Sequence, residues 1–151
     1  CSISTDIIVG LPGETENEFE ETLSAMNIVK FNRSFMFKYS SRPGTKAAEY
    51  TDQVSEEIKQ SRLERLIDLQ QSHTLITNRQ YIGQVVKVLV EKESKKSNLR
   101  WIGRTEGTVG VIFDKHNEKI NDIVNVYITD AQGVSLLGES IVEKESRIEV
   151  N

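Results

Sequence analysis

The sequence predicts an α/β segment followed by an all-β domain, with one long helix between them. Three observations lead to this prediction. The first third of the chain alternates β-branched runs with one amphipathic helix, a long stretch of helical periodicity follows, and after Gly83 the apolar pattern changes to period two. We therefore expect one βαβ unit, one linker helix and one small barrel, in that order.

Composition narrows the classes of protein that the chain can belong to. Of its 151 residues, 37% are hydrophobic and 28% are charged, as in ordinary globular proteins. No apolar run approaches the roughly 18 residues that a membrane-spanning helix needs, so we expect a cytoplasmic protein. The single cysteine, Cys1, excludes an internal disulfide framework and is read as incidental. The net charge of −4 argues against a general nucleic-acid binder but leaves room for a local basic surface.

The first third of the chain has the pattern of a parallel βαβ unit. A nearly continuous β-branched run at 3–9 indicates a strand covered on both faces, and Gly10-Leu11-Pro12-Gly13 ends it. Thr15 and Glu18 have the spacing of a capping box, which starts the helix, and a second strand follows at 34–39. The apolar stripe expected on this helix consists of Phe19, Leu23, Met26 and Val29.

Two parallel strands and one helix cannot bury their own apolar surfaces. We therefore expect this unit to be the last part of a larger α/β sheet or barrel whose earlier strands lie upstream of Cys1. Functional loops in such folds lie at the carboxyl ends of the strands, which here are the residues from Val9 to Leu11 and from Tyr39 to Arg42. The exposed strand edges also suggest that the isolated chain self-associates.

The long helix is expected over 55–82. Ser55 is a suitable N-cap and Gly83 a suitable end, and His73, which lies near the apolar stripe, is read as a partly buried spacer. The polar remainder indicates a helix that packs on the first unit while it leads to the next domain. Its expected apolar stripe consists of Ile58, Leu63, Leu66, Ile67 and Ile76.

The last part of the chain predicts an OB-like barrel of five short strands, at 84–90, 99–104, 109–113, 123–129 and 134–138. Basic residues and one aromatic residue lie along and between its first two strands, opposed locally by Glu91 and Glu93. Two interpretations remain open. Exposed cations around an exposed ring would hold single-stranded or looped RNA, whereas a solvated hairpin would place the ring in the core. The residues concerned are Lys92, Lys95, Lys96, Arg100, Trp101 and Arg104.

Four segments in order carry a resemblance to a known family. They are "TDIIVGLPGETENEF", "FMFKYSSRPGTKAA", "VSEEIKQSRLERLIDLQ" and "WIGRTEGTVGVIF". Together they resemble the carboxyl-terminal third of the radical S-adenosylmethionine tRNA methylthiotransferases, of the MiaB-like branch. The resemblance implies the terminal βαβ part of a radical-SAM, TIM-like barrel at 1–54, a linker helix at 55–82, a TRAM RNA-binding barrel at 83–143 and a tail at 144–151.

The resemblance also implies which residues meet the cofactor. In related enzymes the strand that Ile8 and Gly10 match lies beside the adenine of S-adenosylmethionine. Arg42 is expected to offer its donors to the cofactor carboxylate or to an RNA phosphate. The alternative interpretations are a tight strand-to-helix turn at Gly10 and a salt bridge from Arg42 that braces its own loop.

The cysteines of the family's two iron-sulfur clusters are absent from this chain. The family holds one cluster with a CxxxCxxC motif and the other with three further cysteines, whereas this chain has only Cys1. We therefore predict that the chain has no catalytic residues of its own, binds no metal, and alone neither cleaves S-adenosylmethionine nor transfers sulfur. Both clusters and S-adenosylmethionine are expected only in the intact enzyme.

For the intact enzyme the resemblance implies addition of a methylthio group to isopentenylated adenosine beside the anticodon. The expected partners are a tRNA anticodon stem-loop and the missing amino-terminal domains of the same chain. Three alternatives remain open: a branch that acts on threonylcarbamoyl adenosine, a branch that modifies an aspartate of a ribosomal protein, and a free-standing RNA-binding module without an enzyme.

Overall fold

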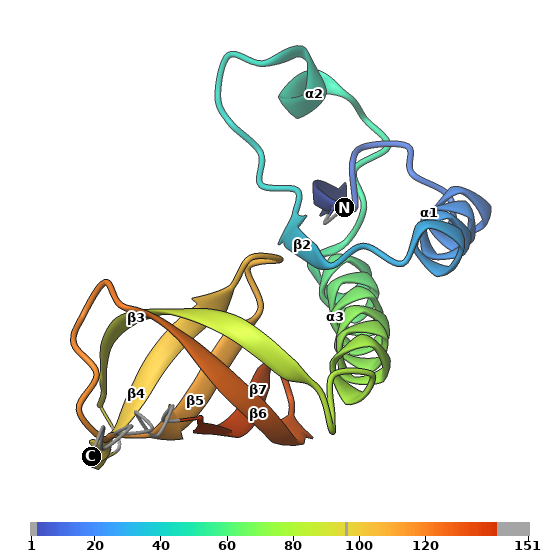
Figure 1. Cartoon of the computed structure of the whole chain (residues 1–151). Helices are drawn as coiled ribbons and strands as arrows, with labels where there is room; N and C mark the ends of the chain where they lie inside the picture. Colours follow the sequence, from blue (N-terminus) through green and yellow to red (C-terminus); the bar gives the residue numbers. More distant parts are fainter. Residues whose placement is uncertain (1–2, 96, 142–151) are drawn as a thin grey trace, which may run out of the picture. The chain divides into compact units, whose positions relative to one another are not determined.

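The computed structural model describes residues 3–95 and 97–141, and the chain forms two compact units, residues 1–77 and 78–151 (Figure 1). Lys96, Cys1 and the expected tail at 144–151 lie outside the described residues. The first unit contains β1 (Ser4–Val9), α1 (Glu16–Val29), β2 (Arg33–Lys38), the short α2 (Lys46–Glu49), which the sequence did not predict, and α3 (Glu56–Arg79), whose last two residues enter the second unit. The second contains β3 (Val85–Ser94), β4 (Ser97–Thr105), β5 (Gly110–Asp114), β6 (Ile123–Gln132) and β7 (Ser135–Ser140).

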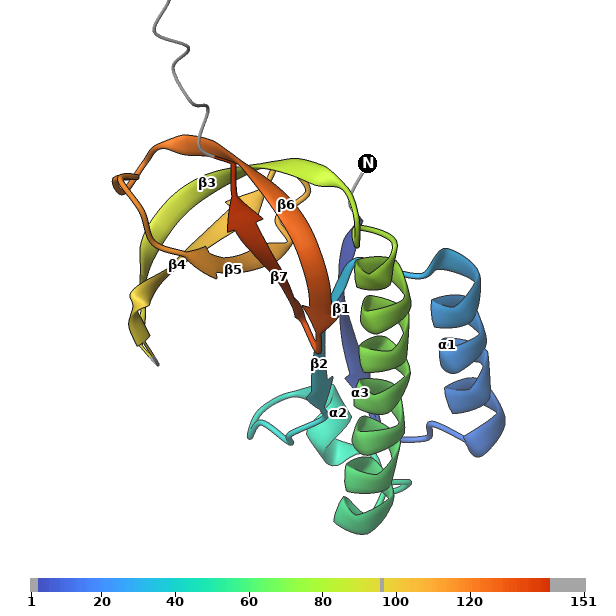
Figure 2. The same ribbon diagram turned by 60° about the horizontal axis from the view of Figure 1, so that its bottom comes forward.

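The first unit is the expected βαβ unit with α3 packed on it. β1 and β2 pair in parallel, with Ile8 opposite Phe37. α1 and α3 run alongside each other (Figure 2), and their apolar side chains meet the strands in one core. The fully buried members of this core are Val9, Phe19, Met26 and Leu66.

The two faces of this small sheet differ. Because side chains alternate along a strand, Ile7, Val9 and Met36 face the helices. Ile8, Phe35 and Phe37 are about half exposed instead. Parallel sheets normally have both faces covered. A parallel sheet face with three large, half-exposed apolar side chains is therefore unusual.

The capping box of α1 is confirmed. The Thr15 hydroxyl accepts a hydrogen bond from the Glu18 amide at 3.3 Å, and the Glu18 carboxylate accepts one from the Thr15 amide at 2.7 Å. The helix ends at Lys30, which adopts the left-handed conformation with φ 51°. Val29, expected in the apolar stripe, is 44% exposed and does not belong to the core.

The stripe expected on α3 is partly wrong. Leu63 and Leu66 do face the core, but Ile58 and Ile76 are about half exposed. The α3 residues that are buried in the first unit are instead mostly polar. Each of these polar side chains has a hydrogen-bond partner within that unit. The buried polar residues of α3 in the first unit are Lys59, Arg62, Gln70 and His73.

Two of these buried groups show how polar residues replace an apolar stripe. Gln70 accepts a hydrogen bond from the Ser34 hydroxyl at 2.7 Å and donates one to the Phe31 carbonyl at 3.0 Å, which ties α3 to the start of β2. His73 Nε2 lies 3.0 Å from Asn27 Oδ1 of α1. His73 is thus the buried spacer that the sequence indicated.

The second unit is a five-stranded barrel. Its strands pair in the order β3-β4-β5-β7-β6, and β6 pairs back with β3 to close it. All pairs are antiparallel except β5 with β7. The barrel interior is a dense apolar core that includes Val88, Val111, Phe113, Val126 and Leu136.

The barrel core imposes a strict size limit at Gly103. A Cβ atom at this position would lie 2.4 Å from the Leu89 carbonyl oxygen and 2.5 Å from Val88 Cγ1. We therefore expect Gly103→Ala to destabilise the barrel by about 1 to 3 kcal/mol, the usual effect of overpacking. Urea denaturation of the chain measures it. Gly107→Ala is the matched control, since the nearest atom there is 3.8 Å away; equal losses in both variants would contradict the packing argument.

His73 makes the stability of the first unit depend on pH. Burial, and secondarily the charge of Lys30, lower the pKa of His73 from its ordinary value. The unfolded chain therefore takes up a proton at a higher pH than folded His73 does, so that stability is lost as the pH falls below the ordinary histidine pKa of about 6.5. We expect His73→Gln to weaken this loss, as measured by urea denaturation at pH 7.5 and 5.5. Identical pH dependence in the variant and the parent chain would contradict it.

Candidate nucleic-acid interface and strand-end loops

The loop after β1 is held in an unusual backbone conformation. Gly10 has φ 75°, and a Cβ atom there would lie 2.3 Å from Lys59 Cγ of α3. Its amide donates a hydrogen bond of 2.6 Å to Glu14 Oε2. Glycine is therefore required at this position by both conformation and space.

Glu14 is in turn held by a buried arginine of α3. Arg62 Nη1 donates to Glu14 Oε2 at 2.7 Å and to the Glu14 carbonyl at 3.0 Å. The side chains are 5% and 12% exposed, respectively, so the pair is shielded from water. The structure thus supports the interpretation of Gly10 as part of a tight turn. Its amide already donates a hydrogen bond to Glu14.

The other two cofactor-facing candidates lie at the surface. Ile8 is half exposed on the open face of the sheet. Arg42 is exposed, and its side chain has no hydrogen bond or ion pair with any residue that the structure describes. The alternative of a bracing salt bridge is therefore wrong within that part of the chain. The loop is instead closed by Thr45, whose amide and hydroxyl donate to the Arg42 carbonyl at 3.2 and 2.8 Å.

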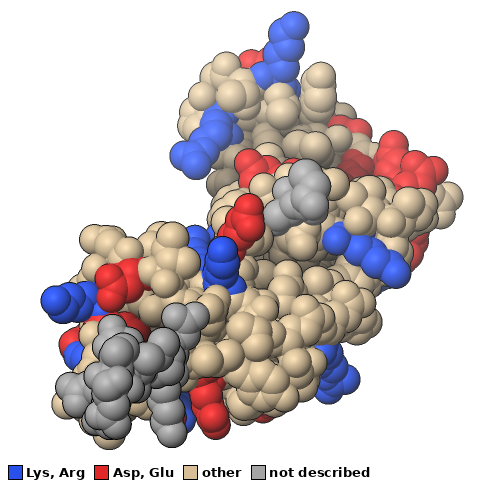
Figure 3. Space-filling view, viewed as in Figure 1, with Lys and Arg blue, Asp and Glu red and all other residues tan. Residues whose placement is uncertain are grey.

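The expected basic surface of the barrel is partly neutralised. Arg100 Nε lies 3.2 Å from Asp114 Oδ1, and Arg104 Nε lies 3.1 Å from Glu91 Oε1. Asp114 was missed because it lies on β5 and is distant in sequence. On the face of the barrel seen in Figure 3, blue and red side chains lie next to each other rather than in one blue field.

Two lysines of the β3–β4 hairpin keep a free charge. Lys92 and Lys95 are exposed, and neither has a carboxylate partner among the residues at 3–95 and 97–141. Lys96, predicted with them, lies outside the described residues. The free cations of the predicted set are therefore at the hairpin and not on the strand that carries the arginines.

Of the two interpretations of Trp101, the structure supports the one that places the ring in the core. Its side chain is 4% exposed and belongs to the barrel core. Lys115 Nζ lies 4.4 Å from the ring centroid and covers it from the rim. The physical reason is strand alternation: Arg100 and Arg104 point outward from β4, so the ring between them in sequence points inward. The same alternation, applied to the sequence, favours the core interpretation.

An exposed aromatic ring lies elsewhere on the barrel. Tyr127 of β6 is 43% exposed and pairs across the strands with Val85. The pair formed by Lys87 and Asn125 is the second one along the same two strands and shares this face of the sheet. Tyr127 is not among the RNA-binding residues predicted from the sequence. Its signal is again period two, since Val126 and Ile128, on either side of it, are buried.

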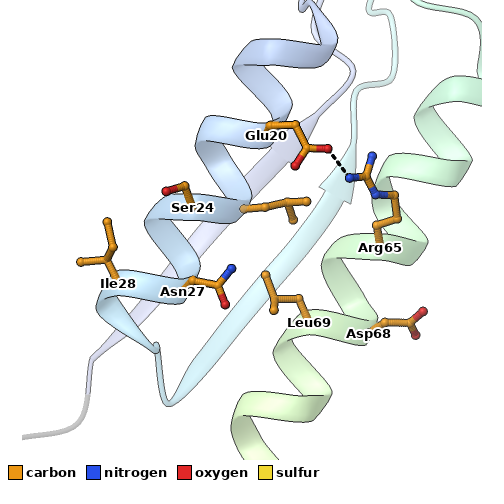
Figure 4. A pocket seen from close by; sticks show the side chains of 8 residues that line it. Glu20, Ser24, Asn27, Ile28, Arg65, Asp68 and Leu69 are labelled. Carbon is orange, nitrogen blue, oxygen red and sulfur yellow. Dashed lines mark hydrogen bonds and ion pairs between the residues drawn. The ribbon is translucent and has the colours of Figure 1, made fainter.

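One open groove lies away from the strand ends, between α1 and α3. It has a volume of about 650 Å³, and Figure 4 shows Glu20 and Arg65 facing each other across it. Its other lining residues are Leu23, Ser24, Asn27, Ile28, Asp68 and Leu69. The described residues contain no group of three or more potential metal ligands and no helix long and apolar enough to cross a membrane.

Comparison with known proteins places the barrel in a recognised class of domain. Residues 79–141 match the TRAM domain, which covers the end of α3 and all five barrel strands. The second unit is therefore a TRAM domain. Its match begins a few residues before the boundary expected at residue 83.

Most of the chain is similar to a set of curated tRNA-2-methylthio-N(6)-dimethylallyladenosine synthases. Identity is 46% over 142 residues with the protein of Christiangramia forsetii, 47% over 137 residues with that of Geotalea uraniireducens and 44% over 140 residues with that of Clostridium botulinum. These matches cover 93%, 91% and 93% of the chain, but only 30%, 31% and 31% of the relatives. The chain thus spans about a third of their length, and the resemblance drawn from its motifs is confirmed.

Burial of Trp101 yields a stability prediction. We expect Trp101→Ala to destabilise the barrel by about 3 to 5 kcal/mol, because it leaves a large cavity in the core. Chemical denaturation followed by circular dichroism measures the loss. Ile123→Ala, at a largely exposed position, is the control and should change stability by less than about 0.5 kcal/mol. A Trp101→Ala chain as stable as the control would show that the ring is not in the core.

Proposed function

We propose that the chain is the carboxyl-terminal part of a radical S-adenosylmethionine methylthiotransferase that modifies isopentenylated adenosine beside the anticodon of tRNA. The observation that carries the proposal is that one chain contains both a TRAM domain and a βαβ unit whose sheet has only two strands among the described residues. The names of the relatives and the share of their length that the chain matches support it. The proposal also places the intact enzyme in the cytoplasm.

The open face of the sheet supports a larger barrel. Ile8, Phe35 and Phe37 leave apolar surface exposed on a parallel sheet, which normally has both faces covered. In our proposal, β1 and β2 are the terminal strands of the radical-SAM barrel, and strands from the missing amino-terminal domains complete it. The isolated chain would instead cover this face by self-association, which light scattering tests.

The strand ends have the groups that S-adenosylmethionine needs on one side of its pocket. Ile8 offers apolar surface for the adenine, the Gly10 turn brings backbone close to it, and the unpaired Arg42 offers a fork of donors to the carboxylate. When bound in the intact enzyme, the cofactor supplies a carbon radical, and the chain's own residues hold and orient it. The iron-sulfur clusters do not fit this chain, which has one cysteine, so their ligands belong to the missing domains.

We propose that the TRAM domain holds the anticodon stem-loop through its β3–β4 hairpin. Lys92, Lys95 and Lys96 supply the charge, with Lys92 and Lys95 unpaired among the described residues. Arg100 and Arg104 contribute less in the free protein, because each must first leave a carboxylate. Trp101 supports the strand from inside and does not stack on a base.

One alternative gains from the same observations. A barrel whose arginines are paired with carboxylates, and which carries exposed apolar side chains such as Leu99 and Ile123, also suits a protein partner. The branch that modifies a ribosomal-protein aspartate would use such a surface. The branch for threonylcarbamoyl adenosine predicts the same RNA contacts as our proposal, and the free-standing RNA-binding module leaves the βαβ unit unexplained.

Binding of an anticodon stem-loop to the chain tests the RNA interface. We expect affinity to fall steeply with salt, and the double variant Lys92→Ala, Lys95→Ala to reduce the slope of log K against log salt by about 1 to 2. Fluorescence anisotropy across a salt series measures both. Lys87→Ala, a lysine on the β3–β6 face, is the matched control.

The outcomes separate the candidate functions. Reduced slope in the double variant but not in Lys87→Ala supports the hairpin interface. Equal effects of both would move the interface to the β3–β6 face, and no binding of RNA together with binding of a ribosomal protein would favour the protein-modifying branch.

A further inference from the structure

The contact between α3 and the loop after β1 has no role in the function proposed above. Four hydrogen bonds converge there on the Arg62 guanidinium: Nη1 donates to the side chain and carbonyl of Glu14, and Nε and Nη2 donate to Glu16 Oε2 at 3.4 and 3.2 Å. The guanidinium carbon also lies 5.4 Å from the Phe19 ring centroid. The orientation of this side chain is therefore fixed from several sides.

The contact reaches the strand end through one carboxylate. Glu14 Oε2 accepts from Arg62 Nη1 at 2.7 Å and from the Gly10 amide at 2.6 Å. One oxygen thus joins the arginine of α3 to the residue that follows β1. Because the pair is nearly buried, loss of Arg62 leaves the Glu14 carboxylate without its countercharge next to the loop, whereas loss of Glu14 leaves Arg62 paired with Glu16.

We infer that Arg62 is a positioning residue, which acts through Glu14 to hold the Gly10–Glu14 loop in the shape that the cofactor pocket requires. The inference rests on the proposed function, in which this loop borders S-adenosylmethionine. It adds a role for α3: the helix that leads to the TRAM domain also fixes the geometry of the pocket rim.

The neighbouring arginine provides a matched control. Arg65 lies three positions further along α3 and also binds carboxylates of α1, with Glu16 at 2.6 Å and Glu20 as its second partner. It covers the same Phe19 ring, at 4.8 Å from the centroid. Its guanidinium bonds Glu16 and Glu20 but no residue at 10–14 of the described chain, so it shares the packing role of Arg62 but not the contact with the loop.

The test uses the full-length enzyme that contains this chain, with loaded clusters, as wild type, Arg62→Gln, Arg62→Lys and Arg65→Gln. Hydrogen exchange of the 10–14 peptide without cofactor reports the loop, equilibrium dialysis reports the Kd of S-adenosylmethionine, and thermal melting reports stability. We expect Arg62→Gln to speed exchange at 10–14 and to raise Kd roughly tenfold, the factor for one lost charged hydrogen bond. Arg62→Lys should recover part of the affinity, since it restores the charge but not the fork of donors.

A merely structural role predicts a different pattern. Arg65→Gln should lower the melting temperature without faster exchange at 10–14 or a change in Kd. A Kd that follows the melting temperature equally in both variants, or an unchanged Kd in Arg62→Gln, would overturn the inference while the wild-type protein still binds the cofactor.

Failure of the proposed function gives its own result. A wild-type enzyme that does not bind S-adenosylmethionine would overturn the proposed function and, with it, the role of Arg62 at the pocket. The wild-type measurement alone therefore separates the two.

Discussion

The buried ion pair between Arg62 and Glu14 is the interaction on which the first unit depends. One carboxylate oxygen of Glu14 accepts hydrogen bonds from both the Arg62 guanidinium of α3 and the Gly10 amide. Removing one partner from a buried pair typically costs about 3 to 5 kcal/mol, and here the larger loss is expected on removal of Arg62, which leaves Glu14 without its countercharge. A small unit with a single apolar core has little stability to spare, so this contact sets both the position of α3 and the shape of the loop.

The same polar logic extends along the helix. Lys59 packs its stem against Gly10, Gln70 bonds the start of β2 and His73 meets Asn27. Directional bonds of this kind define the helix register more sharply than apolar contacts, which tolerate sliding. α3 is therefore held to the rest of the first unit by polar contacts at several positions along its length.

In the barrel, alternation along β4 decides which residues face solvent. Trp101 fills the core, and Gly103 lets β3 and β4 approach closely, whereas Arg100 and Arg104 extend outward to carboxylates on neighbouring strands. The basic character of the segment is thus divided between paired arginines and the unpaired Lys92 and Lys95. The sequence gives the number of basic residues on a surface. Their ion pairs in the folded protein determine how many of them are free to bind a phosphate.

The sequence by itself determined the order of elements, the capping box of α1, the five barrel strands and the family resemblance, because these depend on local propensity and periodicity. Only the tertiary structure decided that Arg62 and Gln70 are buried on α3, that Ile58 is exposed, and that Asp114 and Glu91 pair with the arginines. Each of these depends on a partner from another element, such as Glu14, 48 residues away from Arg62. Local pattern identifies which residues can pair, but folding brings the partners together, and for polar side chains the partner decides between core and surface.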